Sequence, residues 1–425
     1  MQRPFSIPTG PITLDNLAIP GPLVGSSEAL VTRSVTIADG RFRREPAPDR
    51  IDAGGRIGLP ALIDMHTHLD KGHIWPRQPN PDGSFDGALA AVGADREAHW
   101  SADDVRARMQ FALECAYAYG TKAIRTHIDS IGKQTDISFG VFQELREVWR
   151  GKIDLQAVCL VGSEHIEPDG DGTFAHVANV TQEAGGVLGY VPTPLPDIDA
   201  RIANFFRIAA ARGMNADLHV DETGDPSVNT LKTIAQTVID SGFEGTVVCG
   251  HCCSLAVMDD DEADRTMDLV AQAGINIVSL PMCNLYLQDR GDGTRTPRWR
   301  GVTLVHELKA RGVNVAFASD NTRDPFYAFG DLDMVEVMRE ATRIAHLDHT
   351  TNDWVRSFTT TPAQVCGFDY APFEAGTPAD FVVVSARSWN EFFSRPQAHR
   401  AVIRDGVALD LSPPSYAALD TLMEH

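Results

Sequence analysis

The sequence predicts an α/β fold, namely a (β/α)8 barrel of the TIM type with a small β-sandwich domain built from both termini. Three observations lead to this prediction. Short apolar runs alternate with longer helical patterns through the middle of the chain. Both ends contain mainly short strand-like runs, and metal-ligand residue types recur where the central runs end.

Eight short apolar runs are predicted to form the barrel strands. In chain order they are Ile57–Met65, Ala123–Ile128, Leu155–Val161, Val187–Val191, Ala216–Val220, Gly245–Gly250, Ile275–Leu280 and Val313–Ser319. A doubly wound open sheet is the alternative architecture. The barrel is favoured because no glycine-rich phosphate turn follows the first run.

Helical patterns lie between these runs or follow them. Four examples are Asp103–Tyr119, Asp199–Arg212, Asp261–Ala273 and Leu332–Ala345. Ser101 and Asp104 fit a capping box at the start of the first helix.

The two ends of the chain predict a separate small domain. Ala29–Ile37 reads as a strand followed by a turn at Asp39-Gly40, and residues 401–404 precede a hairpin turn at Asp405-Gly406. We therefore expect residues 1–55 and 376–425 to form the β-sandwich and residues 56–375 to form the catalytic barrel.

Composition limits the partners and the compartment. The 425 residues carry 37 Lys and Arg against 58 Asp and Glu, a net charge of −21, which disfavours nucleic acid as a partner. No apolar stretch reaches the length of a membrane helix, and the first 25 residues contain no apolar signal region. Seven scattered cysteines argue for a reducing cytoplasm.

Potential metal ligands occur at the ends of four predicted strands. His66 and His68 follow the first strand and point to one side, because strand side chains alternate with period two. His219 lies near the end of the fifth strand, His251 follows the sixth, and Asp320 follows the eighth. Carboxyl ends of barrel strands meet at one mouth, so these residues suit a hydrolytic Zn²⁺ or Fe²⁺ centre.

This set of residues resembles the amidohydrolase superfamily, and within it the cytosine deaminase branch. The shared ligand pattern comprises His66-x-His68, His219-x-x-Glu222, His251 and Asp320. Further similar segments are Arg125–Asp129, Asn284–Gln288 and Asp324–Tyr327. The resemblance implies a (β/α)8 barrel with a flanking β-sandwich, one metal ion, hydrolytic deamination and a homo-oligomer.

The resemblance also implies the roles of individual residues. His66, His68, His219 and Asp320 would hold one divalent ion, zinc or iron, which activates water as hydroxide. Many relatives bridge two metals through a lysine after the fourth strand, but no lysine lies between Lys152 and Lys232. A mononuclear centre is therefore expected.

Three side chains are expected to perform catalysis. Asp320 would take the proton of the attacking water. Glu222 would protonate a ring nitrogen and pass the proton to leaving ammonia, and His251 would orient the hydroxide. Whether His251 also binds the metal is left open at this point.

The expected substrate pocket departs from the cytosine deaminase pattern. A glutamine that pairs with the pyrimidine edge in that branch is replaced here by a segment containing Ser163 and Glu164. Asn321 and Phe326 also differ from the residues of the branch. Lys71, just after His68, either reaches the site or is a surface charge. Such differences change which donors and acceptors are read. We expect a cytosine-like substrate such as cytosine, isocytosine, a pterin or a triazine.

Two other functions fit the same residues. The first is hydrolysis of an N-alkyl-substituted heterocycle or a cyclic amide. The second is a catalytically inactive metal-binding barrel, which the joint presence of Glu222, His251 and Asp320 disfavours.

Overall fold

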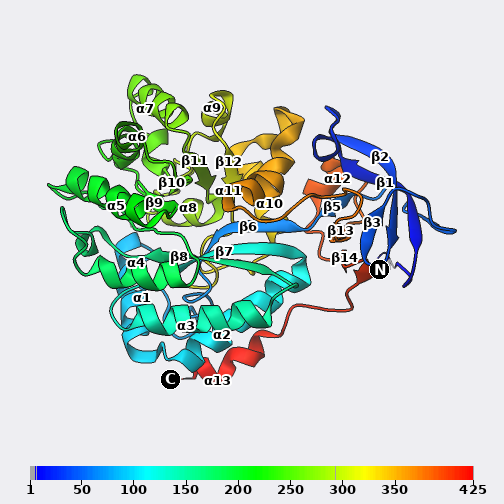
Figure 1. Cartoon of the computed structure of the whole chain (residues 1–425), viewed down its shortest axis with the longest axis horizontal. Coiled ribbons are helices and arrows are strands. Elements are labelled where there is room, and N and C mark those ends of the chain that lie inside the picture. The colour runs from blue at the N-terminus through cyan, green and yellow to red at the C-terminus, as the bar shows by residue number, and fades with distance from the viewer. Residues whose placement is uncertain (1–4, 6, 292, 425) are drawn as a thin grey trace. The chain divides into compact units, whose positions relative to one another are not determined.

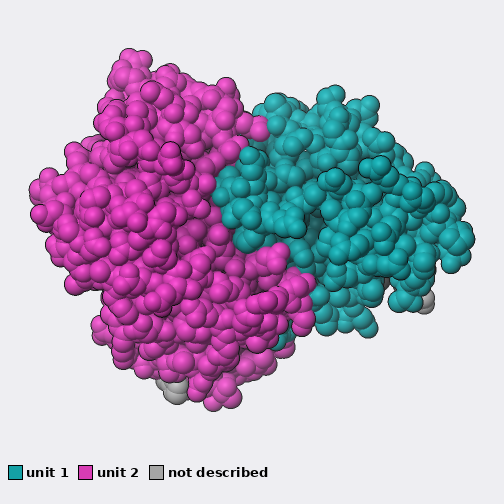
Figure 2. All heavy atoms as spheres, viewed as in Figure 1, with its two compact units in different colours: residues 1–64, 114–123, 332–414 teal, residues 65–113, 124–331, 415–425 magenta. Residues whose placement is uncertain are grey.

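The structure is a computed structural model that describes residue 5 and residues 7–291 and 293–424. The chain divides into two compact units, which are coloured separately in Figure 2. Unit 1 consists of Met1–Asp64, Glu114–Ala123 and Leu332–Pro414. Unit 2 consists of Met65–Leu113, Ile124–Asp331 and Ser415–His425.

The strands of unit 1 form two four-stranded sheets, with the orders β3-β2-β1-β4 and β15-β14-β13-β5. They are β1 (Ile12–Pro20), β2 (Leu30–Ala38), β3 (Arg41–Arg43), β4 (Asp49–Asp52), β5 (Gly58–Pro60), β13 (Phe381–Val383), β14 (Ala401–Arg404) and β15 (Val407–Ala408). Side chains from both sheets share one apolar core that includes Leu14, Ile37, Phe381 and Ile403. Burial of this shared core holds the two sheets together.

Two hairpins of unit 1 turn where the sequence predicts them. Asp39-Gly40 joins β2 to β3, with φ of 52° and 72°, and Asp405-Gly406 joins β14 to β15, with φ of 46° and 72°. Two consecutive residues in the left-handed region are typical of the type I′ turn, which matches the twist of the flanking strands.

The remaining strands form two further sheets, with the orders β6-β7-β8 and β12-β11-β10-β9, and belong to unit 2 apart from the first three residues of β6 and of β7. They are β6 (Leu62–Thr67), β7 (Thr121–Asp129), β8 (Asp154–Leu160), β9 (Ala216–Val220), β10 (Val247–His251), β11 (Asn276–Ser279) and β12 (Val315–Phe317). All pairs from β9 to β12 are parallel. Isolated parallel bridges join Val158 to Val187, Leu188 to Ala216, and Thr67 to Asp320.

Helices lie between most of these strands in the sequence, and Figure 1 shows α3 to α7 on the outer side of the strands of unit 2. The α-helices are α1 (Phe85–His99), α2 (Ala102–Tyr119), α3 (Gln134–Val148), α4 (Phe174–Glu183), α5 (Ile198–Arg212), α6 (Thr230–Ser241), α7 (Asp260–Gln272), α8 (Pro281–Leu287), α9 (Val305–Ala310), α10 (Met334–Ala345), α11 (Thr360–Cys366), α12 (Trp389–Ser394) and α13 (Asp420–Met423). In the described part of the chain, none of them combines the length and apolarity needed to cross a bilayer. Because helices lie between the parallel strands, the protein is an α/β protein with parallel sheets.

The four helices predicted from the sequence are present, with ends that differ by at most two residues. Ser101 Oγ accepts a hydrogen bond of 3.3 Å from the backbone N–H of Asp104, as the capping box requires. The Asp104 carboxylate does not complete the box. It binds the guanidinium groups of Arg77 and Arg108 instead.

The first predicted strand, Ile57–Met65, is wrong as a single element. It is divided at Ala61 into β5, which pairs antiparallel with β13, and β6, which joins β7. Pro60 explains the division, because proline has no N–H to continue the ladder.

The fourth predicted strand, Val187–Val191, is reduced to isolated bridges at Val187, Leu188 and Val191. Gly189 in its middle makes thiol contacts instead of ladder hydrogen bonds. Its N–H donates to Cys159 Sγ at 3.3 Å, and its carbonyl accepts from the same sulfur at 3.4 Å. A Cβ at this position would lie 2.3 Å from the carbonyl oxygen of Asp217, so only glycine fits.

Candidate metal centre and active site

Four side chains that could hold a metal ion lie at the carboxyl ends of strands. His66 is in β6, His68 follows that strand, His219 is in β9, and Asp320 follows β12. The backbone joins the first and last of these segments. The Asp320 N–H donates to the carbonyl of His66 at 2.9 Å, and the Thr67 hydroxyl donates to the carbonyl of Asp320 at 2.7 Å. The carboxylate is therefore held beside both imidazoles of the His-x-His segment.

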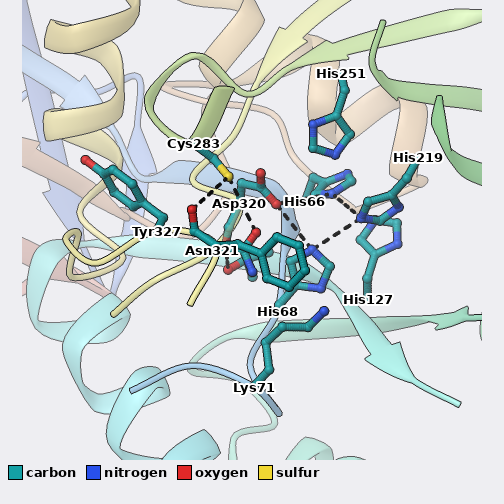
Figure 3. Close-up of polar contacts among 12 residues, drawn as sticks. His66, His68, Lys71, His127, His219, His251, Cys283, Asp320, Asn321 and Tyr327 are labelled. Carbon is teal, nitrogen blue, oxygen red and sulfur yellow. Dashed lines mark hydrogen bonds and ion pairs between the residues drawn. The ribbon is translucent and has the colours of Figure 1, made fainter. Parts of the chain in front are cut away.

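The donor atoms of these four residues converge (Figure 3). His219 Nε2 lies 3.1 Å from His66 Nε2 and 3.3 Å from His68 Nε2, and Asp320 Oδ1 lies 3.2 Å from His68 Nε2. Two ligands that each bind zinc at about 2.1 Å in tetrahedral geometry are about 3.4 Å apart. The spacing therefore fits the first coordination shell of a single divalent ion.

Burial keeps the three imidazoles in the form that binds metal. His66, His68 and His219 are buried, and this burial lowers the pKa of each ring well below its ordinary value. Neighbouring positive groups lower these pKa values further, with Lys71 acting on both His68 and His219. The rings are thus neutral near pH 7 and offer their lone pairs.

Glu222, His251 and Asn284 form a second group beside the four ligands. Asn284 Nδ2 donates to Glu222 Oε1 at 3.1 Å and contacts His251 Nδ1 at 2.9 Å. Gln288 Nε2 donates to the backbone carbonyl of Glu222 at 3.1 Å, which holds this segment from the same side. Burial, and then the negative charge of Asp320, raise the pKa of Glu222 well above its ordinary value. A protonated Glu222 can therefore act as an acid in this site.

The contact with Asn284 defines the tautomer of His251. An amide nitrogen only donates, so His251 Nδ1 accepts and the ring proton lies on Nε2. Burial lowers the pKa of His251 to about 3, so the ring is a neutral donor. The set of four convergent ligands does not include His251.

Two of these residues have an unusual backbone conformation. His251 and Asp320 have φ of 67° and 62°, in the left-handed region that side chains other than glycine rarely adopt. Such a conformation costs about 1–2 kcal/mol per residue and is typical of functional sites. The preceding Gly250 provides room, because a Cβ there would lie 3.1 Å from His66 Cε1.

Lys71, Asn321 and Phe326 form a further group of neighbouring side chains, of which Lys71 and Asn321 are labelled in Figure 3. Lys71 Nζ is 3.0 Å from Asp129 Oδ1 and 5.2 Å from the centroid of the Phe326 ring. Asn321 Nδ2 donates to Asp324 Oδ2 at 2.8 Å, and Asp324 Oδ1 accepts from the backbone N–H of Phe326 at 2.8 Å. Asp324 therefore positions both Asn321 and Phe326.

The structure does not bring Ser163 and Glu164 into this group of contacts. The Ser163 hydroxyl donates to the carbonyl of Val191 at 3.0 Å and accepts from the N–H of Thr193 at 2.8 Å, so it joins two backbone segments. Glu164 is an exposed side chain that lies 3.4 Å from His165. Their expected roles in substrate binding stay a prediction.

Three polar residues of the site have no role assigned from the sequence. They are Asn284, which links Glu222 to His251, Cys283, whose sulfur lies 3.6 Å from Asn321 Oδ1, and His127, whose ring lies 3.9 Å from that of His66. Asn284 could have been found from its segment, which already resembles the deaminase branch. His127 could have been found in the same way, because it lies within the similar segment Arg125–Asp129. Cys283 carries no comparable signal, since a buried thiol is common in any core.

A sequence profile of the amidohydrolase family matches residues 165–410. A pterin deaminase of Rhizobium rhizogenes is 56% identical over 406 residues, which covers 94% of this chain and 92% of that protein. An N-isopropylammelide isopropyl amidohydrolase of a Pseudomonas species is 25% identical over 360 residues, covering 80% of this chain and 82% of that protein.

Solved structures support the same fold. A 5-methylcytosine deaminase from Klebsiella pneumoniae, liganded with phosphonocytosine, matches with a TM-score of 0.79 at 24% identity. The match covers 93% of this chain and 97% of that chain. At this identity the comparison bears on the fold alone.

Proposed function

The chain belongs to the amidohydrolase family, and we propose that it is a metal-dependent aminohydrolase that deaminates a pterin. The observation that carries this proposal is the position of Glu222, which accepts a hydrogen bond from Asn284 at 3.1 Å, beside four side chains whose donor atoms converge. The 56% identity to a pterin deaminase selects pterins from the amino-heterocycles considered above.

The proposed cofactor is one divalent ion, zinc or iron, held by His66, His68, His219 and Asp320. The donor set of three neutral imidazoles and a carboxylate supports either metal. The lysine-free stretch between Lys152 and Lys232 supports a single ion. When bound, this ion supplies Lewis acidity that makes water a nucleophile near neutral pH.

The side chains would move the protons of the reaction. Asp320 accepts a proton from the attacking water, and His251 donates a hydrogen bond from Nε2 that orients the oxygen. Glu222 donates its proton to a ring nitrogen next to the amine-bearing carbon. The water oxygen bonds to that carbon, the C–N bond breaks, and the proton taken up by Asp320 leaves with the amine as ammonia. The second water proton returns to Glu222 and replaces the one given to the ring nitrogen. The product carries an oxo group where the amine was.

The proposed substrate contacts are Lys71, Phe326, Asn321, Ser163 and Glu164. Lys71 and Asn321 are supported by their places in the segments that carry His68 and Asp320, and Phe326 by its ring, 5.2 Å from the Lys71 ammonium. The Ser163 hydroxyl bonds to the backbone, so its contribution would be to hold the loop that carries Glu164.

We propose that the parallel strands of unit 2 close into a (β/α)8 barrel. The bridges between Val158 and Val187, Leu188 and Ala216, and Thr67 and Asp320 support this closure, because they link the two parallel sheets on both sides. The shared core of the two sheets in unit 1 supports a β-sandwich. The proposed domains are residues 1–55 with 376–425, and residues 56–375.

The remaining parts of the proposal concern partners and location. The net charge of −21 supports a small-molecule substrate and no nucleic acid partner. All seven cysteines are free and buried, which supports a cytoplasmic location. A membrane partner is not proposed. A homo-oligomer is proposed by analogy with the family.

The proposed activity predicts that the purified protein releases ammonia from pterin and forms 2,4-dioxopteridine in equal amounts. Pterin, isocytosine, cytosine and an N-alkylamino triazine should be compared in parallel by ammonia release and product absorbance. Release of an alkylamine from the triazine, with no reaction of pterin, would support the alternative N-alkyl hydrolase. No release from any compound would contradict enzymatic activity on this class.

Removal of the metal should abolish this activity and lower the melting temperature. An ion present at a free concentration about 1000 times its Kd stabilises the folded state by about 4 kcal/mol. For a chain of this length that corresponds to a fall of about 5 °C in Tm after chelation. Calorimetry of chelated, zinc-loaded and iron-loaded protein measures the effect, and an unchanged Tm and rate after complete metal removal would contradict it.

A further inference from the structure

Lys71 is a buried cation beside the metal ligands. Its side chain is 6% exposed, and its ammonium lies 5.2 Å from the centroid of the Phe326 ring. We propose that Lys71 is a specificity-determining residue that binds an oxo group on the amine-bearing ring of the substrate. This inference rests on the proposed function and deepens it, because it restricts the substrate to amino-oxo heterocycles.

The turn that carries Lys71 is held rigidly. The buried Arg108 guanidinium donates to the backbone carbonyls of Asp70 and Gly72 on both sides of Lys71. Asp104 binds Arg108 at 2.8 Å, so the guanidinium is itself held in place. A preorganised donor of this kind favours a fixed acceptor position on a ligand.

The ammonium of Lys71 has hydrogen-bonding capacity beyond its ion pair. Asp129 Oδ1 occupies one N–H at 3.0 Å, and Arg96 occupies the other oxygen of the same carboxylate at 2.9 Å. The ring face of Phe326 lies 5.2 Å away on another side of the ammonium. An ammonium has three N–H donors, so a donor is available for a substrate oxygen.

The neighbours of Lys71 indicate which part of the substrate it would bind. The turn that carries it bonds back to the His68 segment, with the Gly72 N–H donating to the carbonyl of His68 at 3.1 Å, and the Lys71 ammonium faces the Phe326 ring. Attack on the amine-bearing carbon sends negative charge into the ring, and a conjugated oxo group accepts part of that charge. A fixed cation near this oxygen stabilises it more in the transition state than in the ground state.

The test compares two substrates that differ only in the oxo group. They are pterin, which is 2-amino-4-oxopteridine, and 2-aminopteridine. Replacing Lys71 with Met should lower kcat/KM for pterin by about 10- to 100-fold and should change the value for 2-aminopteridine by less than about threefold. Equilibrium binding of both compounds, measured by their fluorescence, should change in the same pattern.

Two further variants control for folding. A combined Lys71→Gln and Asp129→Asn variant removes both charges of the buried pair and avoids an unpaired carboxylate. Lys122→Met removes a comparable lysine from its 3.1 Å ion pair with Asp380 in unit 1, and it should leave the ratio of the two substrates unchanged.

Equal losses for both substrates, or no loss for pterin in a folded, metal-loaded variant, would overturn the proposed role of Lys71. A wild-type protein that deaminates neither compound would instead contradict the proposed function. In that case equilibrium binding still tests the role of Lys71. Wild-type protein should bind pterin more tightly than 2-aminopteridine, and the Lys71→Met variant should lose this difference.

Discussion

Replacing Glu222 with Gln is expected to lower kcat for pterin by about 10³-fold or more while the metal content stays unchanged. The glutamine amide keeps the size of the side chain and can still contact Asn284, but it has no acidic proton to give to the ring nitrogen. Glu222 lies outside the set of three histidines and Asp320, so the ion should remain bound. Steady-state kinetics together with metal analysis of the same sample measure both effects.

The pH dependence of the wild-type protein gives a second test of Glu222. Burial and the charge of Asp320 raise its pKa, so the acidic form persists toward neutral pH. The rate should fall as the pH rises through this pKa, because deprotonation removes the acid. The Gln variant should lose this fall, and exposed Glu183→Gln should retain it together with the wild-type rate. A near-normal rate in a metal-loaded Glu222→Gln protein would exclude Glu222 as the proton donor.

Replacing Asp320 with Asn should remove both the metal and the activity. The carboxylate is the one anionic member of the four-ligand set, and it lies 3.2 Å from His68 Nε2. A neutral amide weakens the attraction for a divalent cation and cannot accept the proton of the attacking water. We expect kcat/KM to fall by more than about 10³-fold and the ion to be lost on dialysis.

Metal analysis separates the two roles of Asp320. If excess zinc restores occupancy of the variant but not its rate, Asp320 acts as a base as well as a ligand. Asp169→Asn, at an exposed position, serves as the matched control and should keep both metal and rate. An Asp320→Asn protein with full metal content and a normal rate would contradict both roles.

The ligand residues were predictable from the sequence because their geometry depends on local rules. Period-two alternation places His66 and His68 on one side of a strand, and carboxyl ends of parallel strands meet at one edge. The structure accordingly brings both together with His219 and Asp320. Helices were predictable for a similar reason, since apolar periodicity and caps are encoded within each segment.

Contacts between distant segments were not predictable in this way. Asn284 reaches Glu222, 62 residues away in the sequence, and the Ser163 hydroxyl accepts a hydrogen bond from the N–H of Thr193. The left-handed conformation of His251 and Asp320 also has no sequence signature, because neither residue is a glycine. Pro60 indicates an interruption of the first predicted strand, but the apolar residues on both sides of it predict one continuous element.

The burial of every cysteine has a consequence for the study of motion in this protein. All seven cysteines are buried thiols that form no disulfide. The sulfur of Cys159 contacts both the N–H and the carbonyl of Gly189. A thiol reagent in solution therefore modifies these residues only when the surrounding structure opens. The rate of modification at each cysteine measures the free energy of local opening when closing is faster than the chemical step, and the rate of opening when it is slower. Mass spectrometry of the labelled chain would thus map opening across both units without any engineered probe.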